Sequence, residues 1–113
     1  MKFMLFVCDD AELSATIKDE AAFWDECRAW GTEMAARGVR VDGQILELPE
    51  KARTVRVRNG KPVRSDGPFA ETKEVIGGFD ILECASMDEA LEVAEKHPVA
   101  RYGALEVRPF GRE

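Results

Sequence analysis

No stretch of this sequence approaches the run of about 20 apolar residues that a membrane-spanning helix needs. We therefore expect no membrane partner. Residues 1–8 are apolar, but they contain one basic residue, end at Asp9 and Asp10, and lack a cleavage site of small residues. This pattern favours a first β-strand over a signal peptide, and we expect a cytoplasmic protein.

The sequence also has no excess of basic residues. It contains 16 Lys and Arg against 22 Asp and Glu, which gives a net charge of -6. Proteins that bind nucleic acids usually carry a basic surface, because the release of counterions from phosphates supplies much of their affinity. We therefore expect no nucleic-acid partner, although a local basic patch stays open.

Cysteine is scarce, and the motifs of common catalytic centres are absent. Cys8, Cys27 and Cys84 are widely spaced among apolar residues, which favours buried thiols in a reducing compartment over a disulfide framework or a zinc site. There is no glycine-rich phosphate loop, nucleophile elbow or metal-ligand spacing. We expect neither a cofactor nor a metal, and we interpret the acidic residues between positions 9 and 12 as solvated.

Histidine occurs once, as His97, directly before Pro98. At the end of a predicted helix, a charged or donating imidazole satisfies terminal carbonyl groups and the helix dipole. We therefore predict a structural role for His97.

The length and composition indicate one globular unit. A chain of 113 residues with 45% hydrophobic residues is long enough to bury a core, and no linker or repeat divides it. We therefore expect a single domain over residues 1–113.

The first half alternates strand and helix signals. Residues 2–8 predict a buried strand, and a helix capped by Thr16 or a neighbour follows, with one apolar stripe and an end at Gly38. Residues 39–45 predict a half-buried strand that bends at Gly43. Trp24 lies off the stripe, which fits partial burial, a ligand cavity or an oligomer contact. The stripe consists of Phe23, Cys27, Trp30 and Met34.

Asn59-Gly60 predicts a two-residue type I′ turn between strands 54–58 and 61–64. This turn fixes the register, so Arg56, Arg58 and Lys61 share one face. The basic face suits an anion or an acidic partner, but solvated charges on an edge hairpin also protect against aggregation. The opposite face carries Val55, Val57, Pro62 and Arg64.

The second half predicts a strand at 75–84 with a bulge or close approach at Gly77-Gly78, a helix begun by a Ser86–Glu89 capping box, and a last strand. The order indicates an α+β fold, ferredoxin-like β-α-β-β-α-β, with the hairpin inserted and extending the sheet. Two helices cover one sheet face. The other face should offer valines, leucines and either Phe79 or Ile81, and we expect it to form a homodimer.

Residues 66–74 read Asp-Gly-Pro-Phe-Ala-Glu-Thr-Lys-Glu, and Gly77-Gly78 follows. This motif resembles the signature of the DGPF-domain proteins, a branch of the YCII-related family, and the resemblance extends from residues 2–5 to residues 104–109. It implies a dimeric α+β barrel. It also implies an association with sigma-factor signalling.

The resemblance weakens a histidine mechanism. Enzyme-like members of the wider family use a histidine near the first helix with an aspartate, whereas residues 20–24 here contain none. Tyr102 stands where many DGPF proteins carry a histidine. Asp66 is then the candidate acid or base, although it can equally serve as a turn-building residue. The candidate ligand-binding residues are Trp24, Trp30, Arg64, Phe69, Glu71, Lys73 and Tyr102.

Three functions stay open. The first is an accessory or regulatory protein with a sigma factor or another protein partner. The second is a binding protein or acid–base enzyme for a small apolar or anionic ligand, such as an aromatic or lactone compound. The third is a purely structural dimer module.

Overall fold

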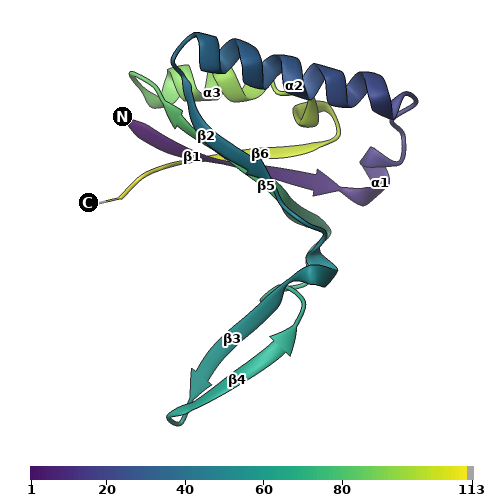
Figure 1. Ribbon diagram of the computed structural model, residues 1–113, viewed down its shortest axis with the longest axis vertical. Helices are drawn as coiled ribbons and strands as arrows, with labels where there is room; N and C mark the ends of the chain where they lie inside the picture. Colours follow the sequence, from purple (N-terminus) through teal and green to yellow (C-terminus); the bar gives the residue numbers. More distant parts are fainter. Residues whose placement is uncertain (112–113) are drawn as a thin grey trace.

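We describe residues 1–111 in a computed structural model (Figure 1). Four strands form one antiparallel sheet in the order β2-β5-β1-β6, which confirms the ferredoxin-like α+β fold. The elements are β1 (Lys2–Asp10), α1 (Ala11–Ser14), α2 (Glu20–Ala36), β2 (Arg40–Ile45), η1 (Pro49–Lys51), β3 (Arg53–Arg58), β4 (Lys61–Asp66), β5 (Glu74–Glu83), α3 (Met87–Glu95), η2 (Pro98–Arg101) and β6 (Gly103–Pro109).

The core lies between the sheet and the pair α2 and α3. Alternation along β1 and β5 turns Phe3, Leu5 and Leu82 toward the helices, where each is fully buried. Burying a side chain of this size stabilises the fold by about 1.5–3 kcal/mol. The helices contribute Trp30, Met34, Ala90, Val93 and Ala94 to the same cluster.

Helix α2 begins and ends at local signals. The N-cap is Asp19, three residues after the expected Thr16, and its carboxylate accepts a hydrogen bond from the N–H of Ala22. Gly38 has a positive φ of 73°, and the N–H of Val39 donates to the carbonyl of Met34 at 2.9 Å. This is the Schellman arrangement that the glycine predicts.

Helix α3 has the predicted capping box. Ser86 accepts a hydrogen bond from the N–H of Glu89, and Glu89 in turn accepts from the N–H of Ala85. The expected role of His97 is wrong in its chemistry. Its Nδ1 accepts from the N–H of Val99 at 3.1 Å, so the imidazole caps the start of η2 and does not donate to the end of α3.

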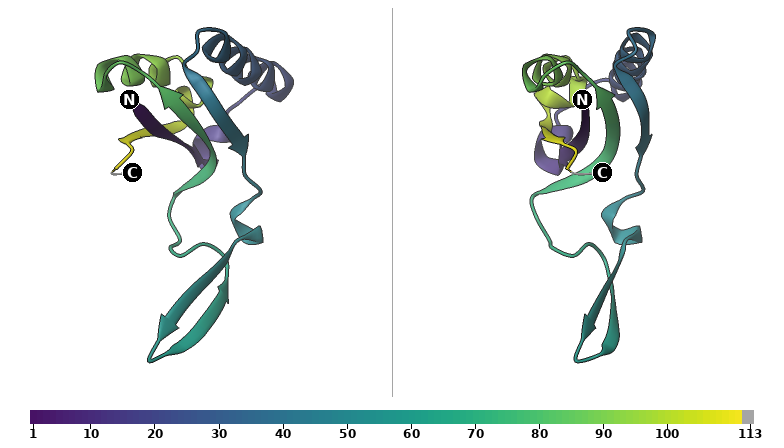
Figure 2. Two further views of the ribbon diagram at one scale, coloured as in Figure 1. Left: turned by 60° about the vertical axis from the view of Figure 1, so that its left-hand side comes forward. Right: turned by 90° about the vertical axis from the view of Figure 1, so that its left-hand side faces the viewer.

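The β3–β4 hairpin, which we call the arm, is a separate two-stranded sheet (Figures 1 and 2). Asn59 and Gly60 both have a positive φ, and Arg58 pairs with Lys61, so the predicted turn and register are confirmed. The expectation that the hairpin extends the main sheet is wrong. Strand β5 is already paired on both sides, by β1 and β2, and offers the arm no free edge.

Strand β2 differs from its prediction. Its irregularity lies between Arg40 and Asp42, not at Gly43, and the residues expected inside at 41 and 45 are exposed. Gly43 instead lies under the side chain of Asp80, because an added Cβ would come 2.1 Å from its Oδ1. That oxygen accepts a hydrogen bond from Nε of Arg40 at 2.7 Å, which forms a partly buried ion pair in which only Asp80 is fully buried.

The predicted bulge in β5 is confirmed. Val7 pairs with Gly78 and Cys8 with Ile76, so Gly77 is an extra residue. Gly78 permits the close approach of β2, since an added Cβ would come 3.1 Å from the carbonyl oxygen of Gln44.

The second face of the sheet, which we call the open face, carries no helix within residues 1–111 (Figure 1). Its centre consists of Met4 and Phe6 of β1 opposite Ile81 and Phe79 of β5, all half-buried. The valines and leucines expected here are not at this centre. The period-two alternation places Leu5 and Leu82 on the helix side.

None of the helices described in residues 1–111 has the length and apolar character needed to span a membrane. All three cysteines are free thiols, and Cys84 is buried while the other two are half-buried. Burial raises the pKa of each of these thiols above its ordinary value.

Candidate functional site

Strand β1 ends in an aspartate that faces the helices. Asp9 follows Leu5 and Val7 in the alternation, so its side chain leaves the sheet on the same side as theirs. Its backbone pairs with Val75 of β5 and Gly103 of β6, which holds it in the middle of the sheet. The carboxylate is therefore positioned by two neighbouring strands rather than by a loop.

Two glycines make room for this carboxylate. A Cβ at Gly77 would lie 2.0 Å from Oδ2 of Asp9. A Cβ at Gly103 would lie 2.1 Å from the carbonyl oxygen of Cys8 and 3.4 Å from Cα of Asp9. A Cβ at Gly77 would displace the Asp9 carboxylate, and a Cβ at Gly103 would displace the backbone of β1, so the bulge glycine has a direct steric role at this site.

The environment of Asp9 favours proton exchange. Burial raises the pKa of its carboxyl group above the ordinary value. Within residues 1–111 its side chain forms no ion pair or hydrogen bond, and its oxygens stay in contact with solvent. Burial is the main cause that raises the pKa of the Cys27 thiol on α2 to about 11, and the charge of Asp9 adds to the rise. The Cys27 thiol is therefore neutral. An accessible carboxyl group with a raised pKa is a typical general acid or base.

An aromatic cluster adjoins this carboxylate. Phe23 of α2 packs edge-on against Tyr102 at 5.5 Å and against Trp24 at 5.8 Å between ring centroids. Gly103, the register partner of Asp9, directly follows Tyr102. Phe23 and Tyr102 line an open cleft of about 280 Å³, whose other walls are Thr16, Ile17, Lys18, Asp19, Ala22, Glu26 and Arg101.

The loop after the arm is attached to the same end of β1. Nζ of Lys73 lies 3.7 Å from Oδ2 of Asp10 and 3.6 Å from Oε2 of Glu12. Asp10 is buried and caps α1, with Oδ1 accepting from the N–H groups of Glu12 and Leu13. Because Lys73 is exposed, each contact stabilises the fold by less than about 1 kcal/mol. Lys73 thus places a positive charge beside the end of β1.

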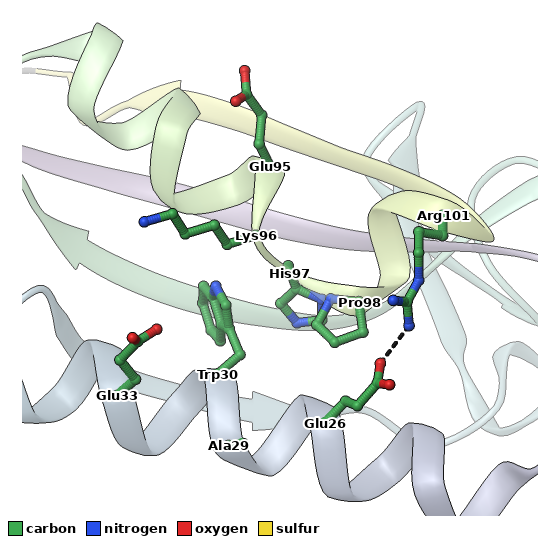
Figure 3. A pocket seen from close by; sticks show the side chains of 9 residues that line it. All are labelled: Glu26, Ala29, Trp30, Glu33, Glu95, Lys96, His97, Pro98 and Arg101. Atoms are coloured by element: carbon green, nitrogen blue, oxygen red, sulfur yellow. Dashed lines mark hydrogen bonds and ion pairs between the residues drawn. The ribbon is translucent and has the colours of Figure 1, made fainter.

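A second open cleft, of about 530 Å³, lies between α2 and the end of α3 (Figure 3). Trp30 and His97 pack against each other at its floor, 4.6 Å between ring centroids. Trp30 donates its Nε1–H to the carbonyl of Val93, and this hydrogen bond fixes the orientation of the indole ring. An ion pair between Glu26 and Arg101 lines both this cleft and the first one.

His97 is poorly suited to proton transfer in the second cleft. Burial lowers the pKa of its imidazole from 6.5 to about 4, and its Nδ1 is occupied by the N–H of Val99. The ring is only 7% exposed. Within residues 1–111 no group of three His, Cys, Asp or Glu side chains is arranged to hold a metal ion.

The structure divides the sequence-predicted site residues among three places. Lys73 lies by the end of β1, Trp24 and Tyr102 both contact Phe23, and Trp30 lies in the second cleft. The others belong to the arm and the loop that follows it, and their functional roles stay predictions. They are Arg64, Asp66, Phe69 and Glu71.

Asp66 ends β4 and is fully accessible. Its Oδ1 lies 3.2 Å from Nε of Arg53, the residue that pairs with it across the hairpin. Gly67 follows with a φ of 88° and donates its N–H to the carbonyl of Ala52 at 2.8 Å. These contacts close the base of the arm.

Sequence reasoning missed Asp9, which we interpreted as a solvated loop residue. The signal was present in the alternation of β1, because Asp9 continues the inward set of Phe3, Leu5 and Val7. An acid on the inward side of a strand otherwise composed of apolar residues is unusual and points to a site.

Comparisons with known proteins agree with this fold. The family model of the YCII-related domain matches residues 1–111. An uncharacterized protein of Rhizobium meliloti (strain 1021) is 48% identical over 61 residues, which cover 52% of this chain and 49% of that protein. The chain thus matches about half the length of this curated relative.

A solved structure is similar over the whole chain. It is a 5-chloro-2-hydroxyhydroquinone dehydrochlorinase from Burkholderia phenoliruptrix AC1100 in complex with 2,5-dihydroxybenzoquinone. The similarity has a TM-score of 0.53 and 20% sequence identity, and it covers 100% of this chain and 96% of the other. At this identity the similarity shows a shared fold, that of the dimeric α+β barrel proteins.

Proposed function

The chain belongs to the YCII-related family, and on that premise we propose that it binds a small hydroxylated aromatic molecule beside Asp9 and exchanges a proton with it. The observation that carries this proposal is the Asp9 carboxyl group, which is half-buried, unpaired among residues 1–111 and raised in pKa. A ligand hydroxyl is a suitable partner, because it donates to the carboxylate and accepts from the neutral acid.

The surroundings of Asp9 support an aromatic ligand. Phe23 and Tyr102 present ring surfaces at the cleft, Trp24 packs edge-on against Phe23, and aromatic rings pack favourably edge-on or offset. A cleft of about 280 Å³ suits a one-ring molecule, slightly below the usual range for drug-sized ligands. The dehydrochlorinase of similar fold, which was solved with a dihydroxybenzoquinone, supports the same class of ligand.

We further propose that two copies associate through the open face in the cytoplasm. Met4, Phe6, Phe79 and Ile81 leave apolar surface exposed on this face, and such surface is costly in water. The free thiols support a reducing compartment. The association with a sigma factor stays a prediction of the family resemblance.

Replacing Asp9 by asparagine tests the proposed site. The amide keeps the shape but cannot exchange a proton, so we expect the affinity for hydroquinone to fall by about tenfold and to lose its pH dependence. Burial raises the Asp9 pKa, which means that the charged form destabilises the folded state near neutral pH. The melting temperature of Asp9→Asn should therefore hold or rise. Trp24 fluorescence and calorimetry measure binding, and an unchanged affinity would refute the proposal.

Replacing Gly77 by alanine tests the same site from the neighbouring strand. The new Cβ would meet Oδ2 of Asp9 at 2.0 Å and push the carboxylate aside. We expect hydroquinone binding to fall as in Asp9→Asn. The free energy of unfolding should change by less than about 1 kcal/mol, because the clash falls on a side-chain end and alanine restricts the unfolded chain. Gly111→Ala, where an added Cβ meets nothing within 4 Å, is the matched control.

A further inference from the structure

No other strand within residues 1–111 pairs with the arm, and its Thr54 and Arg56 side chains donate only to carbonyl groups of the adjoining loop, those of Gly67 and Phe69. Its two strands pair only with each other, and in both views of Figure 2 the hairpin stands away from the main sheet and helices. A two-stranded hairpin alone is at best marginally stable in water. Yet one face of the arm carries Val55 and Val57, which are 62% and 60% exposed, beside Pro62. The arm therefore has both the need for a partner and an apolar surface to offer one.

The charge of the arm is opposite to that of the body, by which we mean all residues outside 53–66. The arm holds five basic residues and one acid, a net charge of +4. The whole chain has a net charge of -6, which leaves -10 on the other 99 residues. Opposite potentials of this kind guide association and fix its orientation.

We propose that the arm of one copy packs, through Val55, Val57 and Pro62, against the body of a second copy. This inference rests on the proposed homodimer and adds the arm to its interface. The two-fold symmetry of a homodimer makes every such contact twice, because each copy offers one arm and one body. Arg64, which pairs with Val55 and shares the valine face, then meets the acidic body of the other copy.

The open face supplies carboxylates beside its apolar centre. Burial raises the pKa of Cys8, and the charges of Glu106 and Glu74 raise it further, which places both carboxylates near this thiol on the open face. Within residues 1–111, Glu74 has no basic partner for its side chain. Glu106 is paired with Arg108, whereas Glu74 is available to Arg64 on the valine face of a partner's arm.

A second copy fits the arm better than a nucleic acid does. Phosphate binding would use the basic face but leave Val55 and Val57 in water, and the acidic body would repel the nucleic-acid backbone. A second copy covers the valines and also places Arg64, on the same face, against an acidic surface.

Hydrogen exchange of the full-length wild-type chain tests the position of the arm. We expect backbone amides in residues 53–66 to exchange at least about tenfold more slowly above the dimer dissociation constant than below it. Exchange in the arm that is fast at every concentration, while the chain is a dimer by sedimentation, would overturn the arm contact and leave the open-face dimer standing. Slow exchange at every concentration in a monomer would overturn both.

A pair of variants gives an independent measurement. The double variant Val55→Thr with Val57→Thr keeps the β-branched shape and strand propensity but removes apolar surface. We therefore expect its dimer dissociation constant to be about tenfold higher than that of the wild type at the same salt concentration. The control variant Leu91→Gln removes an exposed apolar side chain from α3, outside the arm, and should leave the dimer dissociation constant unchanged. Equal affinities for the threonine pair and the wild type would refute the arm contact. Raising NaCl from about 50 mM to about 500 mM should weaken the wild-type dimer, because the arm and body carry opposite charges.

Discussion

Replacing Arg40 by methionine is expected to lower the free energy of unfolding by about 3 kcal/mol near neutral pH, because it leaves the buried carboxylate of Asp80 without its partner. Asp80 is 6% exposed, and its Oδ1 receives the Nε–H of Arg40 at 2.7 Å. Methionine keeps the aliphatic stem that packs beside Gly31 of α2. Chemical denaturation monitored by circular dichroism measures the loss.

The loss should depend on pH in a defined direction. Burial already raises the pKa of Asp80, and the hydrogen bond and charge of Arg40 oppose that rise. Without Arg40 the pKa rises further, so Asp80 becomes protonated and neutral as the pH falls, and the difference from the wild type shrinks. The double variant Arg40→Met with Asp80→Asn should recover part of the stability at neutral pH. A small, pH-independent loss would show that water solvates Asp80.

The stability of the wild-type protein is expected to fall by about 2 kcal/mol from about pH 7 to about pH 5 because of His97. The unfolded imidazole has a pKa of 6.5, whereas burial lowers that of the folded imidazole to about 4. Between these values the unfolded chain binds a proton that the folded chain does not. The stabilising contribution is therefore complete above 6.5 and decreases as the pH falls toward 4.

The variant His97→Asn isolates this contribution. Asparagine retains an acceptor for the N–H of Val99 but does not titrate, and it loses the packing against Trp30. We expect lower stability at every pH but a flatter profile between about pH 5 and pH 7. The slope of the free energy of unfolding against pH is compared between the wild type and His97→Asn. The charged groups around the cleft are present in both proteins, so their contributions cancel in the difference. These groups are Glu26, Glu33, Glu95, Lys96 and Arg101. Equal slopes in both proteins would contradict the assignment.

The parts of the fold that could be predicted from the sequence are those fixed by local chemistry. Gly38 ends α2, Ser86 and Glu89 begin α3, and Asn59-Gly60 turns the arm, because each depends on residues within one turn of the chain. The element order then left few topologies to consider, and the ferredoxin-like order was among them.

The parts that could not be predicted depend on contacts between distant residues. The bend in β2 lies at Val41 rather than Gly43, because Gly43 is needed beneath Asp80, a residue 37 positions later. The room for the Asp9 carboxylate depends on Gly77, a bulge residue of β5 that lies 68 positions later in the sequence. The arm likewise forms a sheet of its own because β2 and β1 already pair with the two edges of β5.

The arm leaves and re-enters the body at almost the same point. Ile45 at the end of β2 pairs with Gly78 of β5, and the N–H of Leu46 donates to the carbonyl of Gly77 at 2.9 Å. Residues 46–73 are therefore an insertion between β2 and β5, and a shorter connection from Ile45 to Glu74 would preserve the pairing of β5 with β1. The insertion is modular, because none of the buried core residues described in residues 1–111 lies in it and a change of its length or sequence need not alter the core.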